Sequence, residues 1–169
     1  MAVNPTQLAN EIVAAVPYPS AATTELIGFA TGVLDELTQN GSATSRNFPG
    51  PHPISGMTGG SMADKIRANS YASFGYTSVP LLNFCTAIVS HIHGMGVVTY
   101  TSPIPANPPP PSDSWFLGGT ISGLNGATLA ALVTAQVPYP FVSPQLISFC
   151  TAITTHIMTN AEVTDGVIA

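Results

Sequence analysis

The stretch Phe149–Ile157 (FCTAITTHI) occurs almost unchanged at Phe84–Ile92 (FCTAIVSHI). A more divergent copy, FATGVLDEL, occupies Phe29–Leu37. The similarity extends upstream of this motif, because Ile54–Ala63 (ISGMTGGSMA) matches Ile121–Ala130 (ISGLNGATLA). Self-similarity over such a length indicates a repeat protein. We therefore predict three structural units of one design.

Each unit is predicted to contain a helix, a proline- or aromatic-rich corner, a second helix and an extended tail. In the first unit, Leu8 and Ile12 lie at helical spacing within a helix expected over residues 5–16. Pro17 cannot continue that helix, and a second helix is expected over residues 23–39.

Serine residues are expected to cap helices of the other two units. Ser61 is predicted as the cap of the first helix in the middle unit. The second helix of that unit should start near Ser78, and Ser143, followed by Pro144, should cap its counterpart in the last unit.

The predicted fold is mainly α. Three degenerate helical-hairpin repeats are expected at residues 1–44, 54–100 and 116–169. Extended linkers rich in proline and glycine, at residues 45–53 and 101–115, should join them.

Short β-prone segments follow the second helices of the last two units. They lie at residues 97–100, 162–164 and 167–168. Because they are so short, they are predicted to be terminal β segments that add to the edge of a neighbour.

The second helix of every unit carries an apolar stripe in one register, with spacings of three and four residues. Three such stripes share one axis within the chain or contribute to a symmetric assembly with other chains. We predict that they form an interface and call them the seam. The seam comprises Leu26, Val33, Leu37, Leu81, Cys85, Ile88, Ile92, Leu146, Cys150, Ile153 and Ile157.

The composition is unusual for a free-standing domain. Charged residues make up 7% of the chain, against about 25% in ordinary soluble proteins, while 45% of the residues are apolar. This composition favours a subunit of a larger assembly. A net charge of −5 argues against a nucleic-acid partner. The sequence has no uninterrupted apolar run of the length that would predict a membrane span.

The cysteines and histidines occupy equivalent positions in the repeats. Cys85 and Cys150 are interpreted as small core residues, with a disulfide between two equivalent helices as the alternative. His91 and His156 are interpreted as rings that pack beside phenylalanine and bond to a backbone carbonyl or water. With His93 they are also candidate metal ligands, and Glu36 occupies the equivalent position of the first unit.

No sequence signature of catalysis stands out, so the chain is not expected to be an enzyme or to need a cofactor. The glycine-rich stretches at residues 56–60 and 123–126 are interpreted as turns that lead into helix caps. Asp35 and Glu36 are expected on a solvated helix end. Trp115 and Phe116, after the second linker, are either the edge of the core or a docking site for a partner.

The stretch Ala152–Val163 has the pattern Ala-Ile-x-x-His-Ile-x-x-Asn-Ala-x-Val. It resembles segments of small structural proteins of tailed-bacteriophage virions, and so do the linkers, which are rich in Ser, Thr, Gly and Pro and poor in charge. The resemblance covers the last third of the chain and part of the middle unit, where Met95-Gly96 replaces Asn-Ala. It implies a capsid, collar or tail component located in the virion, which binds copies of itself or neighbouring virion proteins. The alternative is a small metal- or ligand-binding module that uses the histidines.

Overall fold

The computed structural model describes residues 3–16, 21–43, 52–70, 77–100, 118–137, 142–164 and 166–169. Its helices are α1 (Pro5–Ala15), α2 (Thr24–Asn40), α3 (Gly59–Ser70), α4 (Val79–Met95), α5 (Gly126–Gln136) and α6 (Pro144–Asn160). Its strands are β1 (Ser42–Ala43), β2 (His52–Ser55), β3 (Val97–Tyr100), β4 (Gly119–Ser122), β5 (Glu162–Thr164) and β6 (Val167–Ile168).

Side chains cap the first helix of every unit at equivalent positions. The side-chain oxygens of Asn4 and Asn125 accept hydrogen bonds from backbone N–H groups in the first turns of α1 and α5. In the middle unit the hydroxyl of Thr58 accepts from the backbone N–H of Ser61. Ser61 therefore lies inside α3, and the prediction that it caps this helix was wrong.

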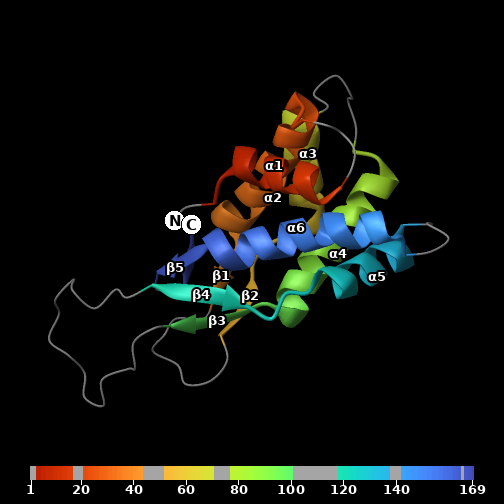
Figure 1. Cartoon of the computed structure of the whole chain (residues 1–169). Helices are drawn as coiled ribbons and strands as arrows, with labels where there is room; N and C mark the ends of the chain where they lie inside the picture. Colours follow the sequence, from red (N-terminus) through yellow and green to blue (C-terminus); the bar gives the residue numbers. More distant parts are fainter. Residues whose placement is uncertain are drawn as a thin grey trace, which may run out of the picture.

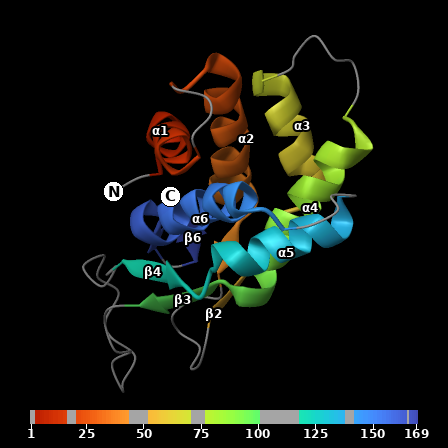
Figure 2. The same cartoon turned by 45° about the vertical axis from the view of Figure 1, so that its right-hand side comes forward.

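The six helices form a closed ring. Each helix packs against the next one in sequence, and α6 packs against α1 (Figures 1 and 2). The rings of Phe29, Phe84 and Phe149, from α2, α4 and α6, meet with centroid separations of 6.0, 5.5 and 6.1 Å. These residues are repeat equivalents, so their near-equilateral contact marks a pseudo-three-fold axis.

The strands correct the predicted fold class. We expected short terminal β segments that add to a neighbour, but β1 to β6 form a closed antiparallel barrel in sequence order. Closure pairs the open edges of the strands with one another inside the chain. One of these strands, β2, begins at His52, within the stretch predicted to be a linker.

Each strand contributes one inward-facing apolar residue, because alternate side chains of a strand point to opposite faces. These residues pair across the unit boundaries, β1 with β2, β3 with β4, and β5 with β6. The pairs are Ala43 with Ile54, Val98 with Ile121, and Val163 with Ile168.

The last strand completes the first unit. In the second and third units a strand, β2 or β4, precedes the first helix of the unit. Ahead of α1 the equivalent place is taken by β6, which pairs with β1 and β5. The two ends of the chain consequently lie beside each other (Figures 1 and 2).

The seam lies inside the molecule. Its members on α2, α4 and α6 are buried, except that Leu26, Leu81 and Leu146 are partly buried against the same core. Of the two arrangements considered for the stripes, a shared axis within one chain is the one observed. Among the described helices, none is both long enough and apolar enough for a membrane span.

Candidate functional site: the polar junctions between units

Buried polar side chains at repeat-equivalent positions lie where one unit packs against the next. Glu36, His91 and His156 occupy equivalent positions on α2, α4 and α6, and each is at most 1% exposed. We call these three residues the junction residues. Each one contacts the residue that caps the first helix of the following unit.

In every junction the contact is the same hydrogen bond. Oε1 of Glu36 accepts from the backbone N–H of Thr58 at 2.8 Å. Nε2 of His91 accepts from Asn125 at 3.0 Å, and Nε2 of His156 accepts from Asn4 at 3.4 Å. The junction residues therefore satisfy backbone N–H groups where two units pack together. This corrects the expectation that the histidines bond to a carbonyl or water.

The second polar contact differs from junction to junction, because it depends on the residue seven positions after the helix cap. That residue is Lys65 on α3, Leu132 on α5 and Glu11 on α1. The chain thus places a base opposite an acid, an apolar residue opposite a histidine, and an acid opposite a histidine.

The junction of α2 with α3 holds a buried ion pair. Nζ of Lys65 lies 2.8 Å from Oε2 of Glu36, and the same oxygen accepts from the Ser61 hydroxyl and the Asn40 amide. Burial raises the pKa of Glu36, but the hydrogen bonds from Lys65, Ser61, Thr58 and Asn40 outweigh it and hold this pKa below its ordinary value. Glu36 is therefore not the solvated carboxylate that the sequence suggested.

The junction of α6 with α1 joins the last unit to the first. Nδ1 of His156 lies 2.9 Å from Oε2 of Glu11. Because Nε2 accepts the Asn4 N–H, we assign the proton of the neutral ring to Nδ1, from which it donates to Glu11. In this tautomer His156 uses both ring nitrogens to link α6 to the start of the chain.

The junction of α4 with α5 lacks the second contact. Leu132 stands in the place of Lys65 and Glu11, and the buried Nδ1 of His91 has no hydrogen-bond partner. Burial lowers the pKa of His91, because the low-dielectric surroundings disfavour the charged ring. This junction is therefore the least satisfied of the three.

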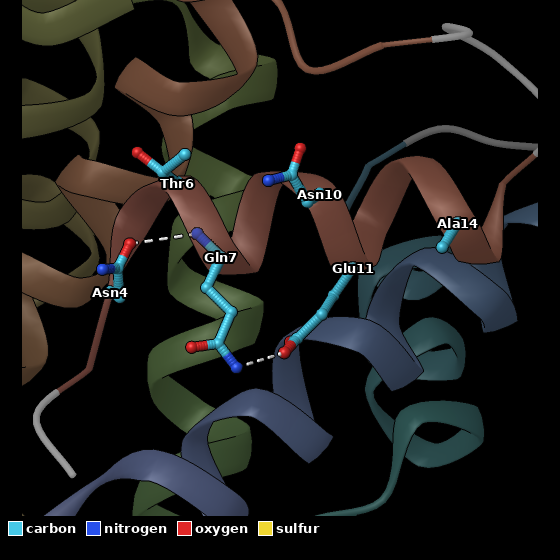
Figure 3. Close-up of a pocket in the computed structure, with 6 residues that line it drawn as sticks. All are labelled: Asn4, Thr6, Gln7, Asn10, Glu11 and Ala14. Carbon is cyan, nitrogen blue, oxygen red and sulfur yellow. Dashed lines mark hydrogen bonds between the residues drawn. The ribbon is translucent and has the colours of Figure 1, made fainter.

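Glu11 also lines a shallow, open groove of about 490 Å³ along α1. Figure 3 shows Asn4, Gln7 and Glu11 linked in series, with Oδ1 of Asn4 accepting from the Gln7 backbone and the Gln7 amide donating to Glu11. In a hydrolytic triad the histidine Nε2 faces the nucleophile. Here it faces the Asn4 backbone, so the pair holds the chain together and is not arranged for proton transfer to a substrate.

The candidate metal ligands do not converge. His91 and His156 bond to the starts of different helices, and Glu36 bonds to a third. In the part of the chain that the structure describes, no cluster of three or more His, Cys, Asp or Glu side chains is arranged around a common point.

The two cysteines are free and buried in the seam. Burial raises the pKa of Cys85 and of Cys150 to about 12, so both thiols are protonated at neutral pH. They pack as small apolar residues, as the sequence predicted. Trp115 and Phe116, the predicted docking residues, lie outside the described residues.

Sequence reasoning missed Lys65 and Glu11 as partners of the junction residues. The repeat alignment already matched Glu36 with the two histidines, and it also matches Lys65 with Glu11 and Leu132. The signal in the sequence is that the acid and the base exchange places between two junctions. Glu36 on α2 faces Lys65 on α3, whereas His156 on α6 faces Glu11 on α1.

Comparison with known proteins gave no match: no protein-family model, curated protein or solved structure is similar to this chain.

Proposed function

We propose that this chain is a non-enzymatic structural protein of a tailed-bacteriophage virion, which attaches to neighbouring virion proteins or to copies of itself as a preassembled ring of three units. The observation that carries the proposal is the closed pseudo-three-fold architecture. Among the described residues, helices α1 to α6 close into a ring and strands β1 to β6 close into a barrel. The resemblance of residues 152–163 to virion structural proteins supports the same proposal.

A single chain with this architecture presents three related surfaces around one axis, as a homotrimer does. Such a chain fits a three-fold symmetric location in a particle. Unlike a homotrimer, it can have different residues in each of its three units. The acid and base residues of the junctions supply such differences inside the ring, since Glu36 meets Lys65 whereas His156 meets Glu11. Attachment to other proteins then takes place through the outer faces, because the seam is used within the chain.

The test is quantitative mass spectrometry of particles from a source lysate, separated on a density gradient. Co-purification with full or empty particles at a fixed copy number per particle is the expected result. A copy number that matches the three-fold positions of the shell would sharpen the assignment. Recovery of the protein only from the soluble fractions would reject the virion proposal.

A further inference from the structure

The three junction residues accept the same backbone hydrogen bond through different chemical groups. Glu36 uses a carboxylate oxygen, whereas His91 and His156 use Nε2 of an imidazole ring. The pKa of Glu36 lies below its ordinary value of 4.5, so this carboxylate still accepts in mildly acidic solution. A histidine ring that takes up a proton carries an N–H group at both nitrogens and accepts no hydrogen bond. Mild acid therefore acts on two of the three junctions.

Protonation of His91 removes the contact between α4 and the start of α5 and supplies nothing in its place. Nε2 lies 3.0 Å from the backbone nitrogen of Asn125, so two N–H groups would face each other across this distance. Nδ1 has no hydrogen-bond partner and the ring is buried, which leaves the new charge without compensation. At the junction of α6 with α1, by contrast, a charge on His156 is paired with Glu11 at 2.9 Å.

Among the described residues packed against α4, no charged group compensates a proton on His91. α5 has no charged residue. On α3, Lys65 is paired with Glu36. Asp64 bonds to Thr77, which precedes α4 and lies at the end of that helix away from His91. Burial accordingly lowers the pKa of His91. The other titratable or charged side chains of α3, β2 and α4 are those of Arg67, His52, Cys85 and His93.

The packing of this junction allows α4 and α5 to part locally. The helices run antiparallel (Figure 2), with His91 bonded to Asn125 at one end and the Asn83 amide donating to the Gln136 carbonyl at the other. Their contact is less extensive than that of α2 with α3. Beside the His91 end, β3 and β4 pair over four residue pairs. This ladder keeps the two units attached when the helices separate.

We propose that His91 is an acid-sensitive latch, whose neutral ring holds α4 against α5 and whose protonation releases the two helices about the β3–β4 ladder. The other two junctions stay closed, because Lys65 and Glu11 pair with the junction residues there. Opening exposes side chains of this junction such as Ala87, which is buried in the closed form. The surface that the ring offers to other proteins then differs between neutral and acidic solution. The inference goes beyond the proposed function and does not depend on it.

The test is amide hydrogen exchange of the full chain, followed by NMR at pH 7.0 and pH 5.5 and corrected for the intrinsic exchange rate at each pH. Asn125 and Thr58 are matched reporters, since their N–H groups make equivalent hydrogen bonds in two junctions. If His91 takes up its proton only in the open form, with its ordinary pKa of 6.5, the protection of Asn125 should fall about eightfold. Thr58 should keep its protection, and the side-chain amide of Asn83 should follow Asn125.

His91→Gln separates the latch from a general loss of stability. Its side-chain oxygen can accept the Asn125 N–H as Oε1 of Glu36 accepts that of Thr58, but it does not titrate. The fall in Asn125 protection should disappear in His91→Gln. It should persist in the matched control His156→Gln, which removes the other junction histidine.

Leu132→Glu is a second variant that keeps the test open if His91→Gln does not fold. Its carboxylate would pair with the protonated ring as Glu11 pairs with His156, so the fall in Asn125 protection should shrink. Circular dichroism shows which variants keep the fold. Equal protection of Asn125 at the two pH values in the wild-type protein would overturn the inference. An equal fall at Thr58, or an undiminished fall in a folded variant at residue 91 or 132, would overturn it as well.

Discussion

The junction of α2 with α3 and the junction of α4 with α5 follow one design but differ in closeness and in polarity. At the first, Gly28 and Gly32 let α3 approach the backbone of α2, and a Cβ on Gly32 would lie 2.5 Å from the backbone nitrogen of Ile66. At the second, Asn83 and Ala87 occupy the equivalent positions. α2 and α3 accordingly share a more extensive contact than α4 and α5.

The buried polar groups of the first junction are also more fully hydrogen-bonded than those of the second. Glu36 receives hydrogen bonds from four residues, while His91 makes one hydrogen bond and leaves Nδ1 without a partner. Buried polar groups stabilise a junction only when they are satisfied. The repeat therefore fixes one backbone hydrogen bond in every junction, whereas the second polar contact differs between junctions and is missing from the junction of α4 with α5.

The largest effect is expected from closing the space between α2 and α3. Gly32→Ala places a methyl group against the backbone of Ile66, which cannot move without displacing α3. We expect the free energy of unfolding to fall by about 3 kcal/mol. Urea denaturation followed by circular dichroism measures it. An unchanged midpoint would show that the two helices do not pack this closely.

The second effect concerns the ion pair. Lys65→Met removes the cation from a carboxylate that is fully buried, and we expect a loss of about 2 kcal/mol at pH 7, because three neutral donors remain. The control is Glu36→Gln combined with Lys65→Met. If the pair interacts as described, the double variant should lose less stability than the sum of the single losses.

The same carboxylate predicts a pH dependence. The pKa of Glu36 is lower in the folded protein than its ordinary value of 4.5. Its contribution to stability is therefore complete above pH 4.5 and is lost as the pH falls through the folded pKa. Glu36→Gln should lack this part of the acid-induced loss in a series of denaturation curves. Parallel pH profiles of the two proteins would contradict the assignment.

A smaller effect is expected from supplying the missing contact of His91. The pKa of His91 is lowered by burial, so the wild-type protein should lose stability as the pH falls below the ordinary histidine value of 6.5. Leu132→Glu places a carboxylate where Glu11 stands in the junction of α6 with α1. We expect little change at pH 7, because the new hydrogen bond offsets the lost apolar contact. At pH 5.5 the variant should be more stable than wild type by about 1 kcal/mol.

Leu132→Gln is the control for that experiment, since it offers an acceptor without a charge. It should change the stability at pH 7 and pH 5.5 by similar amounts. If Leu132→Glu and wild type lose stability in parallel between these pH values, His91 does not face Leu132 in the way that the repeat equivalence implies.

The smallest effect sharpens the contrast with Gly32. A Cβ on Gly94, near the end of α4, would meet no atom within 4 Å. Gly94→Ala should therefore stabilise the protein by about 0.5 kcal/mol, because alanine restricts the unfolded chain and favours the helix. The thermal midpoint measures the gain. A loss of stability would reveal an unseen neighbour.

Part of this structure could be predicted from the sequence. The second helices begin after Ser78 and Ser143, as expected, because a capping side chain followed by proline specifies a helix start locally. The seam positions of α4 and α6 are buried because their spacing places them on one face of a helix. The barrel could not be predicted, since strands of two to four residues carry little periodicity and closure depends on partners that are distant in sequence.

The alignment of the repeats predicted which residues of the candidate site are equivalent, but not which residues they contact. The sequence identified Glu36, His91 and His156 as equivalent, but it assigned Glu36 to a solvated helix end and the histidines to carbonyl or water contacts. Their actual partners, such as Thr58 and Lys65, belong to the next unit. A pattern within one helix holds no information about which helix start packs beside it.

The sequence by itself determined the three units, the bounds of α1 and α2 to within one residue, the starts of α4 and α6, and the apolar stripes, because capping, proline and spacing act over a few residues. The tertiary structure alone decided that the stripes share one axis, that β6 completes the first unit, and that Lys65 and Glu11 reach the junction residues. These features require contacts between residues such as Glu11 and His156, which stand 145 positions apart. Only closure of the ring brings them together.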